Sequence, residues 1–487
     1  MNISRQQKQA IGFQYIIDRL MPLTPYGNLA LRNMNAYAPG EHQKLNKELE
    51  NIEKTRTAIL QYPELISALK ETITPIKNIK ASIEKIGTTL TEVDLFEIKR
   101  YLIRLQQIKK AYDALNSQAE FYDIHFDDTT DTLKILDPDN TLIPVFHFSA
   151  KTFPNLQKIR DEKLSIESKI RNTDSTDDVL NELKAQRSVL AAQEQTEEKQ
   201  AAIILSKALI PYKTALQSST SAIASIDLMI LKATLALEYC ATKPQIDATQ
   251  ITLTDMINPM LDDALKGSGM RFTPISIDCS LGTTVITGAN MGGKSVALKT
   301  LALNVLLIHY GFFPFAKNVH CPLLDEIYPV SCDLEDANRG LSSFAGEVVM
   351  LQEILDNIQN KTALILLDEF ARGTNPSEGE VLAKAVCSYL NKRNAYTVMT
   401  THFDGVSSEA STHYQVVGLS KMVLNDELIS KFRELSISQR VRAIGAEMDY
   451  GLVKVNPSKA LPKDAINIAG LLGLDEEIIG LPLSEQP

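Results

Sequence analysis

The sequence predicts a C-terminal α/β domain with a mostly parallel sheet, preceded by a mainly α-helical region. Strand-like and helical runs alternate in the C-terminal half, at residues 363–367, 381–392 and 396–400, an order typical of a parallel sheet covered by helices. In the N-terminal half, Leu, Ile, Lys and Glu recur at helical spacing. We therefore expect a helical region over residues 1–245 and an α/β domain over residues 246–487.

Prolines and polar turns divide the helical region. Pro63 and Pro75 interrupt the first helical stretch, so several helices are expected there rather than one. The β-leaning run at residues 142–148 predicts a small strand element among the helices. Helical spacing resumes over residues 155–170, passes a polar turn at residues 172–176, and continues through a stretch rich in Glu, Lys and Gln into residues 201–240. This pattern predicts two or more long helices.

The composition is that of a soluble globular protein. The chain has 487 residues, of which 44% are apolar and 23% are charged, enough for a sizeable core and more than one domain. Its formal net charge is -10, so the overall charge gives no support for a nucleic-acid partner. A local basic patch would nevertheless suffice to bind phosphates.

Cysteine usage and hydropathy predict a cytoplasmic protein with no membrane partner. The five cysteines include no C-x-x-C pair, so we expect reduced, mostly packed thiols rather than disulfides or a zinc site. The longest apolar stretch, residues 301–315, is broken by His309 and Pro314 and is too short to span a bilayer.

A complete G-x-x-x-x-G-K-S loop stands between an apolar run at residues 284–287 and a helix-forming run at residues 296–308. A phosphate cradle needs glycines for close backbone approach, amides at a helix start to bind anions, a lysine as point charge and a hydroxyl for Mg2+. The loop therefore predicts a nucleotide-phosphate site. Its candidate binding residues are Gly288, Asn290, Met291, Gly292, Gly293, Lys294 and Ser295, with Ser295 also a Mg2+ ligand.

Two later strands end in residues that would complete this site. The strand at residues 363–367 delivers Asp368, suited to hold Mg2+, and Glu369, suited to polarise the attacking water. His402 follows the strand at residues 396–400 and is a candidate to sense the γ-phosphate. The alternatives are that the two acids cap the next helix and that His402 is an ordinary strand-end histidine.

Several motifs together resemble the ATPase domain of the MutS family. They are Asn290-Met291-Gly292 in the loop, the segment 368–374 after the strand, Thr400-Thr401-His402-Phe403, and Arg339 to Phe344 with Glu347. The resemblance implies an ABC-type P-loop NTPase that uses ATP and Mg2+. It also implies a homodimer in which Ser342 and Ser343 of one chain reach the nucleotide of the other. From the residues alone Ser342-Ser343 is a helix N-cap, and both roles can coexist because a helix start also binds anions.

The resemblance extends to a lever helix near residues 221–239 and a C-terminal helical segment near residues 466–479, but parts of the family pattern are missing. No mismatch-reading domain is expected before the helical region, and the one Phe-x-Glu triplet, at residues 432–434, follows the ATPase motifs. A DNA clamp would have to fit between residues 170 and 201, which allows a helical hairpin at most. The chain therefore resembles a shortened MutS relative.

Two functions of different classes follow from this resemblance. The first is an ATPase that hydrolyses ATP across a dimer interface, moves its helical levers, and acts in DNA binding or mismatch-repair-like DNA repair. The alternative keeps the same motor but acts on a protein client, as a remodelling or reactivating chaperone for a cobalamin-dependent aminomutase, for example. A third hypothesis, an inactive scaffold, is disfavoured because every residue type of the nucleotide site is present.

Overall fold

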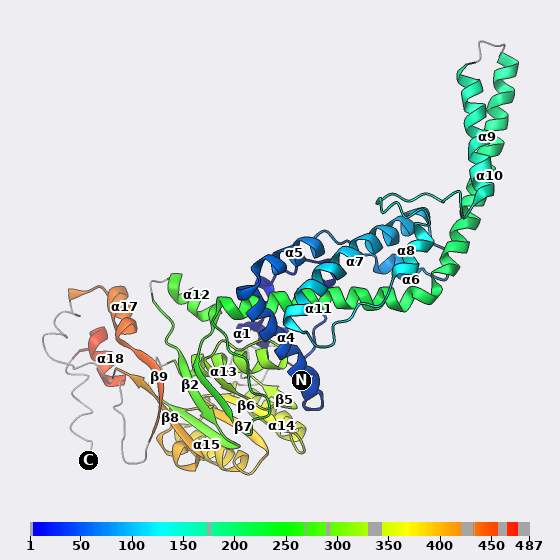
Figure 1. Cartoon of the computed structure of the whole chain (residues 1–487). Helices are drawn as coiled ribbons and strands as arrows, with labels where there is room; N and C mark the ends of the chain where they lie inside the picture. The colour runs from blue at the N-terminus through cyan, green and yellow to red at the C-terminus, as the bar shows by residue number, and fades with distance from the viewer. Residues whose placement is uncertain are drawn as a thin grey trace. The chain divides into compact units, whose positions relative to one another are not determined.

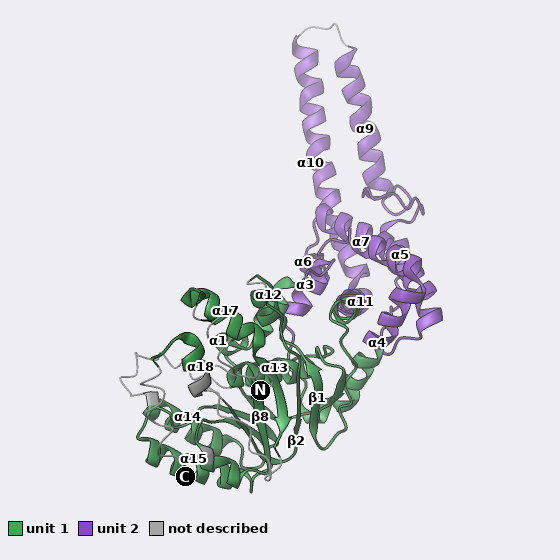
Figure 2. Ribbon diagram, turned by 90° about the vertical axis from the view of Figure 1, so that its left-hand side faces the viewer, with its two compact units in different colours: residues 1–20, 35–50, 232–487 green, residues 21–34, 51–231 purple. Residues whose placement is uncertain are grey.

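The computed structural model divides the chain into two compact units without a single boundary between them. It describes residues 3–172, 177–267, 270–288, 293–329, 343–419, 432, 434–455 and 465–475. Unit 1, green in Figure 2, comprises residues 1–20, 35–50 and 232–487, and unit 2, purple, comprises residues 21–34 and 51–231. This division differs from the expected boundary after residue 245, because two N-terminal segments belong with the C-terminal residues.

Long-range contacts explain why the N-terminus belongs to unit 1. The N-terminal segment that contains helices α1 (Arg5–Ala10) and α2 (Phe13–Arg19) contacts residues of unit 1 that lie far along the sequence. The Nζ of Lys8 donates a hydrogen bond to the hydroxyl of Tyr310 at 2.8 Å, and Asn258 donates to the carbonyl of Ile11 at 3.0 Å. Periodicity within the sequence carries no signal for such contacts, so they were not expected.

Unit 2 is built from helices (Figure 1). They are α3 (Pro25–Arg32), α5 (Pro63–Ile73), α6 (Lys80–Glu84), α7 (Glu92–Ala119), α8 (Thr130–Leu136), α9 (Pro154–Arg171), α10 (Asp177–Ala208) and η2 (Ile210–Tyr212), with parts of α4 (His42–Gln61) and α11 (Lys213–Glu238). The expected breaks are confirmed, because α4 ends at Gln61 and α5 begins at Pro63 and ends before Pro75. Along α7, Leu95, Ile98 and Leu102 are fully buried at helical spacing and form part of the core of the unit.

The expected strand at residues 142–148 does not form, and that prediction is wrong. The alternation that suggested it is present, because Phe146 and Phe148 are buried in the core of unit 2. However, none of the strands in the described part of the chain pairs with this segment, and Pro144 has no amide hydrogen to donate to a ladder. The alternation of apolar residues in this segment therefore reflects the burial of Phe146 and Phe148 and not a β-strand.

The two long helices α9 and α10 form a hairpin, in agreement with the helical runs expected on both sides of the polar turn at residues 172–176. Arg160 joins them, since its guanidinium lies 3.1 Å from Glu194 and 2.8 Å from Glu198. Residues 173–176 of the expected turn between the helices lie outside the described residues.

Unit 1 holds two sheets. The larger has the strand order β5 (Glu326–Tyr328), β6 (Ala363–Asp368), β7 (Ala395–Thr400), β3 (Gly282–Thr287), β8 (Thr412–Gly418) and β9 (Asp449–Lys454). The smaller is antiparallel, with the order β2 (Ile275–Cys279), β1 (Ile251–Met256) and β4 (Asn318–His320). In the larger sheet only β9 runs antiparallel to its neighbour, so this sheet is mostly parallel, in agreement with the expected α/β class.

Unit 1 contains further helices. They include α12 (Pro259–Gly267), α13 (Lys294–His309), α14 (Ser343–Asn357), α15 (Pro376–Leu390), α17 (Ile437–Glu447) and α18 (Ala465–Leu472), with the short turns η1 (Pro39–Glu41) and η4 (Asp404–Glu409). Helix α13 is buried along nearly its whole length, which explains why its sequence is apolar on every side. Helix α15 begins at Pro376 after the N-cap Asn375, whose side chain accepts a hydrogen bond from the amide of Ser377.

One helical stretch in the described residues, Ile210–Glu238, is long and apolar enough to cross a membrane by length and composition alone. Within the protein, 56% of its apolar window is buried. Leu216 and Ile223 on this stretch are fully buried in the core of unit 2, and Asp227 is a buried charged residue. These properties are typical of a core helix.

The cysteines that the structure describes form no disulfide. Cys279, Cys321 and Cys387 are buried and Cys240 is exposed. Burial raises the pKa of Cys279 to about 12 and that of Cys387 to about 11, so both remain protonated thiols at neutral pH. Their burial agrees with the expectation of mostly packed thiols.

Candidate nucleotide site

Three neighbouring strands bring the predicted site residues to one edge of the large sheet. β6, β7 and β3 are parallel neighbours, and their register places Thr400 opposite both Asp368 and Ile286. The carboxyl ends of the three strands therefore lie together, at the edge where open α/β sheets bind ligands.

The two ends of the phosphate loop require glycine. Gly288 has a φ of +138°, and a Cβ there would lie 3.1 Å from the Cβ of Val416. Gly293 has a φ of +82°, and a Cβ there would lie 3.0 Å from the ring of Tyr450. Both positions combine a left-handed backbone with a close neighbour, so a larger residue would displace the loop. The predicted residues Asn290, Met291 and Gly292 lie outside the described residues.

Lys294 is the first residue of α13, and its side chain is only 2% exposed. Its Nζ donates a hydrogen bond to the carbonyl of Gly288 at 2.8 Å and lies 3.2 Å from Oε1 of Glu369. The structure thus places the predicted cation beside the predicted catalytic carboxylate. Ser295 follows in the first turn of the helix, where free amides favour anions.

Thr400 links the two acids. Its hydroxyl donates to Oδ1 of Asp368 at 2.6 Å and accepts from the amide of Glu369 at 2.9 Å. Glu369 has a left-handed backbone, with a φ of +49°, and its other carboxylate oxygen lies 2.6 Å from Arg372. The carboxylate is therefore held between Lys294 and Arg372, with only 13% of its side chain exposed.

Glu347 of α14 supports the turn that carries Glu369. Its Oε2 accepts a hydrogen bond from the amide of Ala371 at 2.9 Å, and Ala371 also has a left-handed backbone, with a φ of +66°. Burial raises the pKa of Glu347 above its ordinary value. Two left-handed non-glycine residues within three positions are costly, so they persist only where surrounding contacts hold them.

The remaining predicted residues are placed only in part. Ser343 is the first residue of α14, and Ser342 lies outside the described residues. His402 follows the end of β7 and is exposed, with its ring 4.2 Å from that of Phe403. The helix start expected at Ser342-Ser343 is therefore present, whereas the reach of these serines to a partner stays a prediction.

The sequence reasoning missed several contacts around the site. The sequence motifs include Thr400 and Arg372 but assign no contact to either. A threonine at a strand end near two acids is itself a signal for a bridging hydroxyl, whereas the pairing of Arg372 with Glu369 has no such signal. Tyr450, which packs against Gly293, and His413, which lies 2.8 Å from the hydroxyl of Thr287, come from β9 and β8. No local pattern could have connected those two to the loop.

The donor set suits a nucleoside triphosphate with Mg2+. Mg2+ prefers oxygen ligands and is usually held by one or two carboxylates together with substrate phosphates. Asp368 offers a carboxylate and Ser295 a hydroxyl at the same edge of the sheet, while Lys294 and the start of α13 offer positive charge for the phosphates. Glu369 is the carboxylate placed to polarise a water molecule.

Comparison with known proteins identifies this region. The family described as MutS domain V, a P-loop ATPase domain, matches residues 284–472. Endonuclease MutS2 of Symbiobacterium thermophilum is 33% identical over 234 residues, which are 47% of this chain and 29% of that protein. The DNA mismatch repair protein MutS of Syntrophomonas wolfei is 30% identical over 281 residues, 57% of this chain and 30% of that protein. Endonuclease MutS2 of Caldanaerobacter subterraneus is 24% identical over 430 residues, 75% of this chain and 53% of that protein.

The matched region contains each part of the site described above, from β3 and the lysine of the loop to the acids after β6 and the threonine of β7. The chain spans about 29% to 53% of the length of these three relatives. The match to domain V and the similarity to these relatives show that residues 284–472 are an ATPase domain of the MutS family.

Proposed function

We propose that this chain binds ATP with Mg2+ and hydrolyses it at two sites, each formed across the interface of a homodimer. The observation that carries the proposal is the cluster of Lys294, Asp368, Glu369 and Thr400 at the carboxyl edge of the sheet. Positioning and charge stabilisation supply most of phosphoryl-transfer catalysis, and this cluster offers both.

The ion pair between Lys294 and Glu369 indicates how the site responds to its ligand. A triphosphate carries far more negative charge than one carboxylate, so it competes for the Nζ of Lys294. Glu369 then becomes available to orient the attacking water, while Thr400 keeps Asp368 in position for Mg2+. Arg372 remains as the second partner of Glu369 and limits its movement.

The second half of each site is proposed to come from the partner chain. Helix α14 begins at Ser343, and the start of a helix is a site for anions. Together with the family resemblance, this supports a role for Ser342 and Ser343 at the phosphates bound by the other subunit.

DNA is the proposed partner of the assembled protein. The relatives named above carry the names of a DNA mismatch repair protein and an endonuclease, and these names favour DNA over the protein client considered as the alternative. The hairpin of α9 and α10 has mixed charge, with Arg160 already paired to two glutamates, so it supplies little evidence by itself.

Mixed dimers test the composite site. We expect Lys294→Ala and the double variant Ser342→Ala/Ser343→Ala each to lose steady-state ATP hydrolysis by about 100-fold or more. Mixing the two inactive variants restores activity, because one site of each mixed dimer then combines an intact Lys294 with intact serines. A matched mixture of Lys294→Ala with Glu369→Gln stays inactive, because these two residues belong to the same half of each site and cannot complement each other across the dimer.

In that control, each site of the mixed dimer lacks either Lys294 or Glu369, because both residues act in the same subunit. No activity is therefore expected there, and co-purification of one variant with a tagged copy of the other shows that subunits exchange. Exchange without recovery in the serine mixture would remove the dimer proposal, and full turnover by a subunit shown by light scattering to be monomeric would do the same.

A further inference from the structure

We propose that unit 2 contains a pocket for a backbone phosphate of nucleic acid, formed by Lys77, Arg100 and Arg104. This inference rests on the proposed DNA partner and names a contact for it. The pocket opens between the loop at residues 75–79 and helix α7, and its volume is about 90 Å³. One water-sized group needs about 10–15 Å³ of such space, so several oxygens of a phosphate fit.

The charge of the pocket is not compensated. Glu97 is its one acidic lining residue against the three cations. No acidic side chain in the described ranges forms an ion pair with any of these three cations. In a chain with a formal net charge of -10, a hollow lined by three unpaired cations is unusual.

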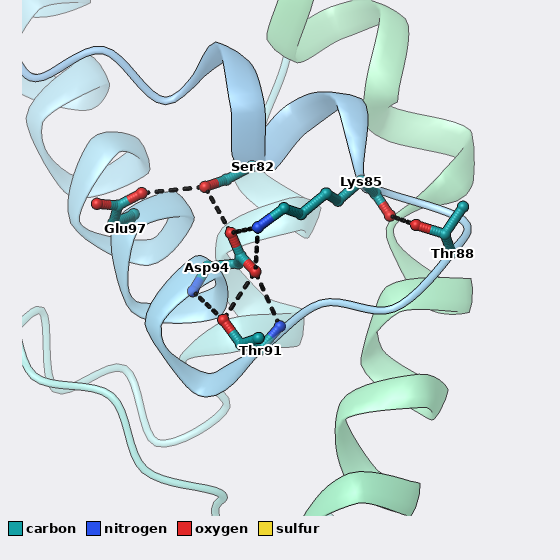
Figure 3. A network of polar contacts seen from close by, with 6 residues as sticks. All are labelled: Ser82, Lys85, Thr88, Thr91, Asp94 and Glu97. Carbon is teal, nitrogen blue, oxygen red and sulfur yellow. Dashed lines mark hydrogen bonds and ion pairs between the residues drawn. The ribbon is translucent and has the colours of Figure 1, made fainter.

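Glu97 belongs to a network of polar contacts near the start of α7 (Figure 3). Its Oε2 accepts a hydrogen bond from the hydroxyl of Ser82 at 3.0 Å, and this hydroxyl also lies 2.9 Å from Asp94. Asp94 in turn caps the start of α7 through Thr91 and pairs with Lys85 at 3.0 Å. Glu97 is thereby committed to the network at the start of α7 and is not paired with the arginines.

The two arginines of the pocket have side-chain partners within the protein. The guanidinium of Arg100 lies 5.2 Å from the ring centroid of Phe96, and Arg104 donates a hydrogen bond to Gln107 at 2.9 Å. Because both side chains already have partners that restrict their rotamers, less conformational entropy is lost when they bind an anion.

The walls of the pocket are equally fixed. The buried hydroxyl of Tyr26 donates to the carbonyl of Lys77 at 3.0 Å and accepts from the amide of Ile79 at 3.1 Å, which fastens the loop. Tyr101 also lines the pocket, and its hydroxyl lies 2.7 Å from that of Ser219 on α11. The hollow is therefore a feature of the packed core and not of a loose surface.

The chemistry of the lining selects phosphate. Guanidinium groups present planar pairs of donors that match phosphate oxygens, and lysine adds a point charge. Contacts of this kind position a nucleic-acid backbone without reading its sequence. One phosphate in this pocket would thus contribute affinity and a salt dependence, but no base preference.

Salt-dependent DNA binding tests the pocket. The double variant Arg100→Gln/Arg104→Gln keeps much of the aliphatic stems, and Lys109→Gln/Lys110→Gln removes the same charge from the same helix outside the pocket. Binding of a labelled 30-base-pair duplex to the full chain is measured by fluorescence anisotropy at several salt concentrations. We expect the pocket variant to bind at least about tenfold more weakly, with a salt slope lower by about 1, and the control to change less than half as much. Thermal unfolding and ATP hydrolysis without DNA confirm that both variants are folded.

Each outcome is decisive. Equal loss in the two variants shows that only overall charge matters and overturns the pocket while leaving the DNA proposal intact. No binding of the duplex by the unaltered protein at low salt overturns both proposals. A third arm adds inorganic pyrophosphate: if it is bound through Arg100 and Arg104, with no effect of these residues on duplex binding, the site takes a free anion and the nucleic-acid assignment is wrong.

Discussion

At the scale of single residues, Glu347 contacts the turn that bears Glu369 and has a left-handed backbone. Its carboxylate satisfies the amide of Ala371 from a different helix. We expect Glu347→Ala to lower kcat for ATP by about tenfold, because an unsatisfied amide costs about 1–3 kcal/mol and part of that cost would fall on the transition state. The KM for ATP changes little, since Lys294 and the phosphate loop are untouched. Glu347→Gln keeps an acceptor and restores most of the rate; equal defects in both variants would refute this role.

The protonation of Glu347 makes a separate prediction about stability. Burial raises its pKa in the folded protein above the ordinary value of 4.5. Because the pKa is raised, the folded protein binds the proton of Glu347 more tightly than the unfolded chain does. Protonated Glu347 therefore stabilises the folded state at a pH below the ordinary pKa, and this stabilisation is lost as the pH rises through the folded-state pKa. Thermal unfolding should therefore show Glu347→Gln gaining stability relative to the unaltered protein as the pH rises from 4.5 upward. A difference independent of pH would contradict the shift.

At the scale of elements, the C-terminal end of α13 is fastened by a buried ion pair. Lys232 of α11 donates to the carbonyl of Tyr310 at 2.9 Å, pairs with Glu48 of α4, and lies 4.4 Å from the ring centroid of Phe312. Tyr37 donates a further hydrogen bond to Glu48. This end of the helix therefore has partners from three separate parts of the sequence.

Breaking that pair from one side should destabilise unit 1. We expect Lys232→Met to lower the free energy of unfolding by about 2–3 kcal/mol, somewhat less than the cost for a fully buried pair, because the side chain of Glu48 is 30% exposed. The double variant Lys232→Met/Glu48→Gln recovers part of this loss, since it leaves no unpaired charge. Urea unfolding of the four proteins of the double-mutant cycle measures the coupling. Additive effects would show that the two side chains do not depend on each other.

The sequence predicts elements well where a signal is local. Pro63 marked a helix start, and the alternation that includes β6, α15 and β7 was visible as strand-like and helical runs. The lysine of the loop and the two acids were identified for the same reason, since each adjoins a recognisable strand or helix. The segment at residues 142–148 failed because alternating burial does not require a neighbouring strand.

The contacts that complete the site are not local. Arg372 lies only three residues from Glu369, but whether it pairs with Glu369 depends on the conformation of the turn. Tyr450 reaches Gly293 across more than a hundred residues, and the N-terminal helices join unit 1 through contacts such as Lys8 with Tyr310. Such contacts depend on the folded topology, which periodicity and motif spacing do not specify.

At the scale of the whole molecule, two helices connect the units. The division between units falls within α4, after residue 50, and within α11, before residue 232. Glu48 and Lys232, which hold the end of α13, stand beside these two points. Because α13 begins at Lys294 and ends at His309, it connects the phosphate loop with the ion pair at the other end. A nucleotide that shifts α13 would thus act on both helices that continue into unit 2.

Hydrogen exchange tests this connection. In a Glu369→Gln background, which binds ATP without turning it over, we expect ATP to change amide exchange in α9 and α10 of unit 2. Adding Lys232→Met/Glu48→Gln should reduce that change by at least about half while the affinity for ATP stays within about twofold, because the phosphate loop is intact. The matched control is Lys243→Met/Glu50→Gln, which removes another ion pair of α4 that does not touch α13. If ATP alters α9 and α10 equally in all three proteins, the signal does not pass through this pair; if it alters them in none, the proposed movement of the helices on ATP binding is wrong.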